Sequence, residues 1–181
     1  FRGEWARANA AVEKARRLNP SDWHLPATVA AVAGRYDDAL AHLPAEARAE
    51  RVVVLTGAGR LHEALELTQT LMKERPSAAM ARQSCYLLAR LQQASAAHTC
   101  EAFLNAVDAA PVSEIAKRHS RLIVALGLGD ETKAMQILRD IEVTGGLRGP
   151  FDFEYVSNSL GDPLLEKPEF IEIRRDLGYQ G

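Results

Sequence analysis

The sequence predicts an all-α fold built from antiparallel helix hairpins that stack side by side. Alanine, the residue with the highest helix propensity, supplies roughly one residue in six. Strand signals are weak, because the one β-branched run, Val52–Leu55, lies inside a long pattern of helical period. Glycines and prolines also recur at a fixed spacing, which is typical of repeated hairpins.

Two segments carry the complete repeat, Gly3–Pro20 and Gly59–Pro76. Each has a large apolar residue two positions after the glycine, a small residue five positions after it and a proline seventeen positions after it. Gly34–Ala39 and Gly129–Ala134 repeat the glycine and the small residue. Glycine permits a left-handed turn between helices, and proline ends a helix. Because one hairpin cannot bury its apolar face alone, the units are expected to stack.

This pattern resembles the tetratricopeptide repeat (TPR) family, whose helix–turn–helix unit has a period of 34 residues. The best match is Gly3–Pro20, which ends in Leu-Asn-Pro like the second helix of that unit. The resemblance covers roughly residues 3–146. It implies a right-handed solenoid over residues 1–146, with a truncated first unit, and a C-terminal helical cap over residues 147–181.

The chain departs from the family pattern at three places. The step from Gly34 to Gly59 is short, Pro26 lies in an opening helix, and the unit that starts near Ala94 lacks its glycine.

Helix boundaries follow from the apolar period and from the breakers. Ser77 and Ser113 stand where N-cap residues belong. The expected helices cover residues 4–18, 22–33, 35–42, 45–57, 60–74, 77–91, 95–109, 112–127 and 130–143.

The C-terminal tail predicts three further helices. The first covers Pro150–Leu160, the second begins near Pro163, and the third runs from Pro168 to Gly178. The stretch from Asp162 to Gly178 also resembles the tail that follows helical repeats in bacterial winged-helix transcriptional activators and cyclases. That resemblance implies an alternative role as a regulatory or sensor domain in bacterial signalling.

Composition excludes several classes of function. The formal net charge of −2 and the pI of about 6.2 lack the basic footprint of a nucleic-acid surface. No apolar stretch approaches the roughly 20 residues of a membrane span. The chain starts at Phe1 without an initiator Met, which is typical of an excised piece of a longer protein.

The two cysteines, Cys85 and Cys100, are expected six residues before and six residues after a hairpin turn, at similar heights. We favour buried thiols and a cytoplasmic location over a disulfide, which would favour the periplasm. His98 lies two residues before Cys100, but three candidate ligands on two helices do not make a four-ligand zinc site. We therefore expect no metal.

No catalytic or cofactor site is expected. Gly57–Gly59 and Gly127–Gly129 are interpreted as hairpin turns, because a dinucleotide fingerprint needs a preceding strand and a further glycine. Glu46 and Glu50, four residues apart, are expected on one helix face as an acidic edge. No serine elbow or cysteine-nucleophile signature is present in the sequence.

The function predicted is a non-catalytic module that binds another protein or a peptide segment in a concave groove. Register against the repeat pattern assigns the groove to the first helix of each hairpin. The candidate groove residues are His24, Glu46, Glu50, Val53, Ser84, Leu88, His119 and Ile123.

Charge placement suggests the chemistry of the partner. The acidic pair Glu46 and Glu50 suggests basic residues opposite the N-terminal half. His119, flanked by Lys117, Arg118 and Arg121, suggests acidic residues opposite the C-terminal half, although a solvated face is the favoured interpretation of the three basic residues.

The N-terminal helix is expected to lack its partner. If the first unit is truncated, Trp5, Ala8, Val12 and Ala15 would leave an apolar face open. This predicts either further chain before Phe1 or self-association through that face.

Overall fold

The computed structural model describes residues 5–143 and 167–176, and these residues form helices without any strand. The predicted all-α class is confirmed. The helices are α1 (Trp5–Leu18), α2 (His24–Val32), α3 (Tyr36–His42), α4 (Arg48–Gly57), α5 (Leu61–Glu74), α6 (Ala78–Arg90), α7 (Ala96–Ala109), α8 (Glu114–Leu128), α9 (Glu131–Val143) and α11 (Pro168–Asp176).

The predicted helix ends agree with the structure where proline or serine sets them. Helices α1, α5 and α7 each end two residues before a proline, at Pro20, Pro76 and Pro111. Ser77 and Ser113 cap α6 and α8, because each hydroxyl accepts a hydrogen bond from the backbone N–H three residues on, at 3.2 Å. Local signals therefore determine these boundaries.

The largest difference from a predicted helix boundary is at the start of α4. Helix α4 begins at Arg48 instead of residue 45, because Pro44–Ala47 forms a turn in which the Ala47 N–H donates to the Pro44 carbonyl at 3.1 Å. Ala47 itself has a non-helical backbone, with φ −76° and ψ 54°. Glu46 therefore lies in a turn, while Glu50 lies in the first turn of α4.

Four turns between neighbouring helices share one backbone geometry, centred on Gly34, Gly59, Gln92 and Gly129. In each turn this residue donates its N–H to the carbonyl three positions earlier, at 3.0–3.1 Å. The next residue donates to the carbonyl five positions earlier, at 2.9 Å. This is the Schellman ending of a helix, which requires a left-handed residue. The unit that lacks its glycine thus keeps the same turn, with Gln92 at a φ of 53°.

Substituting Gln92 by glycine is expected to stabilise the fold by about 0.5–1 kcal/mol, because glycine adopts a positive φ without strain. At the equivalent position of another turn, Gly59→Ala is expected to lower the free energy of unfolding by about 1 kcal/mol. No atom lies within 4 Å of the added Cβ at Gly59, so this cost reflects backbone conformation alone. Urea unfolding of both variants tests the pair, and a Gln92→Gly protein less stable than wild type would contradict the turn assignment.

The small residue five positions after each glycine of the sequence repeat is buried. Ala39, Ala64 and Ala134 are fully buried, and Ala8 is nearly so. Each lies where its helix contacts the preceding or following one. A larger side chain there would push the helices apart.

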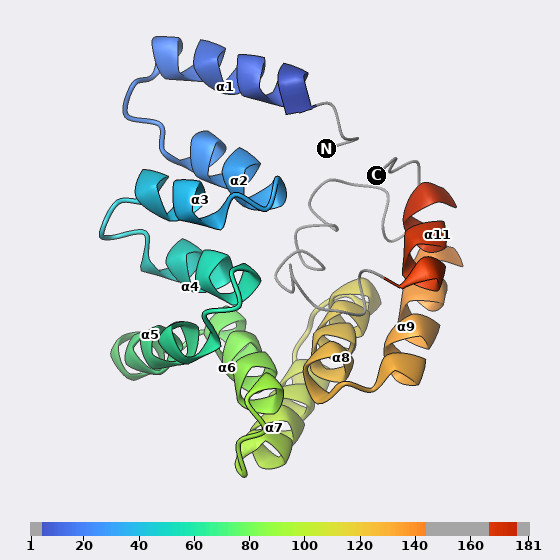
Figure 1. Ribbon diagram of the computed structural model, residues 1–181. Helices are drawn as coiled ribbons and strands as arrows, with labels where there is room; N and C mark the ends of the chain where they lie inside the picture. Colours follow the sequence, from blue (N-terminus) through green and yellow to red (C-terminus); the bar gives the residue numbers. More distant parts are fainter. Residues whose placement is uncertain (1–4, 144–166, 177–181) are drawn as a thin grey trace.

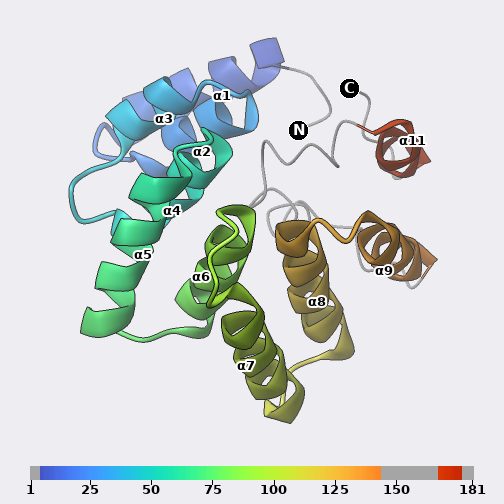
Figure 2. The ribbon, with the colours of Figure 1, turned by 60° about the horizontal axis from the view of Figure 1, so that its bottom comes forward.

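The helices follow one another along an open arc from α1 to α11 (Figure 1). Helix α4 contacts α5, α5 contacts α6, and α6 contacts both α7 and α8. The second view shows α6, α7 and α8 lying side by side (Figure 2). A central cluster of buried apolar side chains joins α4, α5, α6, α8, α9 and α11.

Helix α6 packs directly against α8 and is joined to α4 by a buried side-chain hydrogen bond. Gln83 of α6 donates its side-chain N–H to the Thr56 hydroxyl of α4 at 2.7 Å, in a buried position. A Cβ added to Gly127 of α8 would lie 3.1 Å from the Cα of Tyr86 in α6. Gly127 thus belongs to a helix contact, and only Gly129 of the Gly127–Gly129 run has the left-handed turn conformation.

Helix α11 packs against α9, and its Phe170 is 3% exposed within the central cluster. Lys167, just before α11, forms an ion pair with Glu131 at the start of α9. Helix α11 therefore covers part of the central cluster. The predicted helices at Pro150–Leu160 and after Pro163 lie outside the described residues.

The expectation of an open face on the first helix is wrong for its described side chains. Ala8 and Val12 are buried against Val29 of α2, and Leu25 of α2 packs against them. Ala15 is half-buried. Helix α2, which follows α1 in the chain, covers the apolar side chains of α1, so a preceding helix is not needed to bury them.

Candidate partner-binding site

An apolar hollow of about 670 Å³ lies between α6, α7 and the start of α8, and we call it the α7 groove. Its lining comes from the last turn of α5, the N-terminal half of α6, one side of α7 along nearly its whole length, the connection from α7 to α8, and the first two turns of α8. The lining residues are Met72, Ala78, Ala79, Ala81, Arg82, Ser84, His98, Thr99, Ala102, Phe103, Ala106, Val107, Ala110, Val112, Ala116 and Ser120.

A large apolar side chain stands open to solvent in the lining of the α7 groove, because Val112 is 44% exposed. Ile115, which precedes the lining residue Ala116 in the first turn of α8, is 39% exposed. Phe103 is buried in the satellite cluster that joins α6, α7 and α8. Exposed apolar side chains beside an apolar hollow are typical of surfaces that bind another molecule.

A disulfide holds the two long walls of the α7 groove together. Cys85 of α6 and Cys100 of α7 are bonded, both are buried, and their Cα atoms are 4.9 Å apart. The prediction that these cysteines are buried is confirmed, whereas the preference for free thiols is wrong. The antiparallel register of the hairpin places the two residues at the same height, which is the condition that a disulfide requires.

The short connection from α7 to α8 closes one end of the groove. Ala110 is extended, Pro111 prevents α7 from continuing, and Ser113 caps α8. The Ser120 hydroxyl, also in the lining, donates to the Ala116 carbonyl at 3.0 Å. Local capping thus sets where α8 begins at this end of the groove, and the Ser120 hydroxyl is bonded within its own helix.

The lining of the α7 groove includes one arginine and one histidine and no carboxylate. Arg82 and His98 are its titratable members, and no aspartate or glutamate belongs to it. Asp108 and Glu114 flank the connection from α7 to α8 and are paired within the fold: Asp108 accepts from Arg121, and Glu114 pairs with Lys117.

The basic cluster of α8 is used within the fold. Lys117 donates to the Asp108 carbonyl at 3.1 Å, and Arg121 donates to the Asp108 carboxylate at 2.7 Å. Arg118 donates to the Asp140 carbonyl at 3.3 Å. Asp108 and Asp140 lie in the last turns of α7 and α9, where cations stabilise the negative helix end. These three side chains connect α8 to the ends of α7 and α9 while they stay partly exposed.

The sequence-predicted groove residues do not form one surface. His24, Glu46 and Glu50 are exposed, and Val53 and Ser84 are half-buried. Of these, only Ser84 lines the α7 groove.

Three of the predicted groove residues are corrected. His119 is 4% exposed, Ile123 belongs to the central cluster, and Leu88 belongs to the cluster around the disulfide. They cannot contact a partner in this conformation. Helices α6 and α8 are each packed against two or more neighbours, so most of their circumference is buried.

The acidic edge is also corrected. Because Glu46 lies in the turn before α4, it does not share a helix face with Glu50. Both carboxylates remain exposed.

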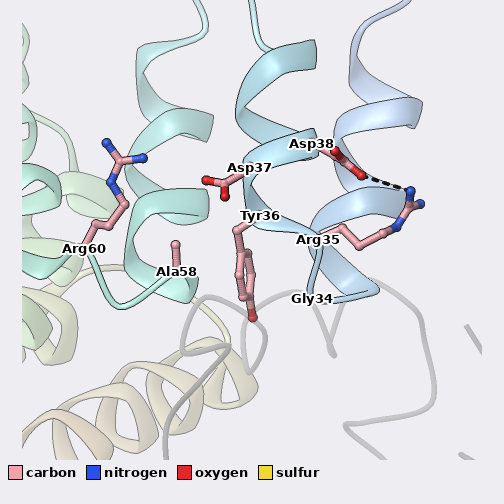
Figure 3. A pocket seen from close by; sticks show the side chains of 7 residues that line it. All are labelled: Gly34, Arg35, Tyr36, Asp37, Asp38, Ala58 and Arg60. Carbon is pink, nitrogen blue, oxygen red and sulfur yellow. Dashed lines mark hydrogen bonds and ion pairs between the residues drawn. The ribbon is translucent and has the colours of Figure 1, made fainter.

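A second hollow of about 520 Å³ lies between the turns at Gly34 and Gly59. Arg35 and Arg60 stand on opposite sides of it, with Tyr36 and Asp37 between them (Figure 3). Arg35 donates to Asp38 at 3.2 Å, and Arg60 donates to Glu63 at 2.7 and 2.6 Å. Burial raises the pKa of the Tyr36 phenol. Arg35 and Arg60 are paired with carboxylates, and both basic and acidic side chains line this hollow. Its charge therefore favours neither an anionic nor a cationic ligand.

Residues 5–143 and 167–176 contain neither a cluster of metal-binding side chains nor a helix that could span a membrane. No group of three histidine, cysteine, aspartate or glutamate side chains in these ranges could hold a metal ion. None of their helices combines the length and the apolar character that crossing a bilayer demands.

Sequence reasoning missed most of the α7 groove because it assigned binding to the first helix of each hairpin. The groove instead uses α7, a second helix. The signal was present in the sequence as small and apolar residues spaced three or four apart, at Thr99, Ala102, Ala106 and Ala110. Such a stripe also fits an ordinary helix contact, so spacing alone could not reveal it.

Comparison with known proteins found no similar protein. No family model, curated protein or solved structure matches the chain.

Proposed function

We propose that this chain is a protein–protein interaction module, a right-handed stack of TPR-like helix hairpins that binds a segment of another protein. The observation that carries the proposal is the α7 groove, an apolar hollow of about 670 Å³ whose lining includes the exposed Val112. A surface of this kind is suited to binding, because burying exposed apolar area drives association.

The repeated local geometry supports the stacked arrangement. Four turns share the same pair of hydrogen bonds, and the small residue after three of them is fully buried. Contacts run between successive helices and from α6 to α8, which is the pattern expected when hairpins stack.

Ala106→Arg is expected to abolish partner capture. Ala106 is exposed and lines the α7 groove, so an arginine there would fill the hollow without disturbing the core. Ala109→Arg is the matched control, because Ala109 is exposed in the same last turn of α7 and lies outside the lining. The immobilised wild type and both variants are incubated with extract of the source cell at matched salt. Bound proteins are identified by mass spectrometry.

The supporting result is a protein bound by the wild type and by Ala109→Arg and lost with Ala106→Arg. With the purified partner, its dissociation constant should rise at least about tenfold for Ala106→Arg. Equal capture by all three proteins would remove the α7 groove from the function. A double variant, Glu46→Lys with Glu50→Lys, tests the exposed acidic side chains in the same assay. Loss of the partner with this variant alone would assign binding to the N-terminal half.

A further inference from the structure

We propose that the occupant of the α7 groove is an amphipathic α-helix whose apolar face carries an acidic side chain at its border. This inference rests on the proposed function, and it adds the secondary structure and the charge of the partner.

The backbone of the groove favours a helical partner. The lining residues belong mainly to α6, α7 and α8, whose backbone N–H and C=O groups are bonded within their own helices. An extended segment would bury its own backbone groups against alanine and valine side chains with no backbone partners, which costs free energy. A helix satisfies its backbone internally and presents only side chains, so it binds such a groove without this cost.

The charge of the lining favours an acidic partner. Arg82 and His98 line the groove on α6 and α7, and no carboxylate belongs to the lining. Arg82 is half-buried and His98 is exposed. An arginine has five N–H donors, so Arg82 can bind a carboxylate while it keeps bonds within the fold. A lysine or arginine of the partner at the same place would meet like charge in a partly desolvated setting.

A pair of synthetic peptides tests both parts of the proposal. Each has about 16 residues, which span roughly 24 Å as a helix, and each carries leucines three and four apart on one face. One peptide has glutamates beside the leucine stripe, and its twin has lysines at the same positions. Fluorescence anisotropy of the labelled peptides gives their dissociation constants for the wild type, for Ala106→Arg and for Arg82→Gln.

The expected result is that the glutamate peptide binds the wild type at least about tenfold more tightly than the lysine peptide. Ala106→Arg should remove binding of the glutamate peptide, and Ala109→Arg should retain it. Arg82→Gln should bring the two peptides to within about threefold, and His98→Gln gives a second test if Arg82→Gln does not fold. The difference between peptides should also shrink as salt rises.

Equal affinity of the two peptides would overturn the charge assignment. A third peptide, the glutamate sequence with two central prolines that break its helix, tests the secondary structure. If it bound as tightly as the intact glutamate peptide, the helical assignment would be overturned. Binding of none of the peptides would also overturn this inference. The proposed function is tested separately by the capture assay. If a partner is captured by the wild type and lost with Ala106→Arg, the proposed function is supported even when none of these peptides binds.

Discussion

Replacing Cys85 and Cys100 together by alanine is expected to lower the free energy of unfolding by about 3 kcal/mol. The disulfide joins residues 15 apart in sequence, and closing a loop of that length restricts the unfolded chain by about this amount. Both sulfur atoms belong to buried residues in the cluster that also contains Phe103, so the substitution also removes packing there. The hairpin that forms two walls of the α7 groove should loosen as a result.

Urea unfolding followed by circular dichroism measures this effect. Wild type should lose a similar amount of stability when it is assayed with a reductant, whereas the double alanine variant should be insensitive to the reductant. Intact-mass measurement after alkylation, with and without reductant, confirms which state each sample holds. A double variant as stable as the oxidised wild type would contradict the role given to this bond.

Leu122→Ala is expected to destabilise the protein by about 3 kcal/mol. Leu122 of α8 is 1% exposed and belongs to the central cluster, which joins α4, α5, α6, α8, α9 and α11. Truncation removes buried methyl groups and leaves a cavity that the surrounding helices can fill only in part. Because the cluster joins six helices, the loss should appear in one cooperative transition.

Leu128→Ala is the matched control for this prediction. Leu128 is the last residue of the same helix and is 52% exposed, so its truncation should change stability by less than about 0.5 kcal/mol. Thermal and urea unfolding of the two variants should differ accordingly. Equal effects at both positions would contradict the location of the core.

Most helices could be predicted from the sequence because their ends depend on local chemistry. Pro20, Pro76 and Pro111 stop helices through missing N–H groups, and Ser77 and Ser113 start them through side-chain caps. The start of α4 was misplaced because Pro44–Ala47 forms a turn where the alanine-rich sequence itself favours a helix.

The candidate site could not be predicted in the same way, because its form depends on contacts between helices far apart in sequence. His119 and Ile123 have the spacing of a groove-facing stripe, but they are buried because α8 packs between α6 and α9. Lys117 and Arg121 look like a basic surface in sequence, yet they bind the end of α7. The disulfide likewise depends on the register of α6 against α7, which spacing suggests but does not determine.

The most direct test of the central claim is site-specific photo-crosslinking of the chain in the source cell. A benzophenone amino acid is placed at Ala106, inside the α7 groove, or at Ala97, an exposed residue of the same helix outside the lining. The adducts are identified by mass spectrometry, and both proteins are checked for an unchanged unfolding midpoint. We predict a specific crosslinked protein from position 106 that is absent from position 97. Identical adducts from both positions, or none from position 106 beside a specific adduct at position 97, would contradict a binding role for the α7 groove.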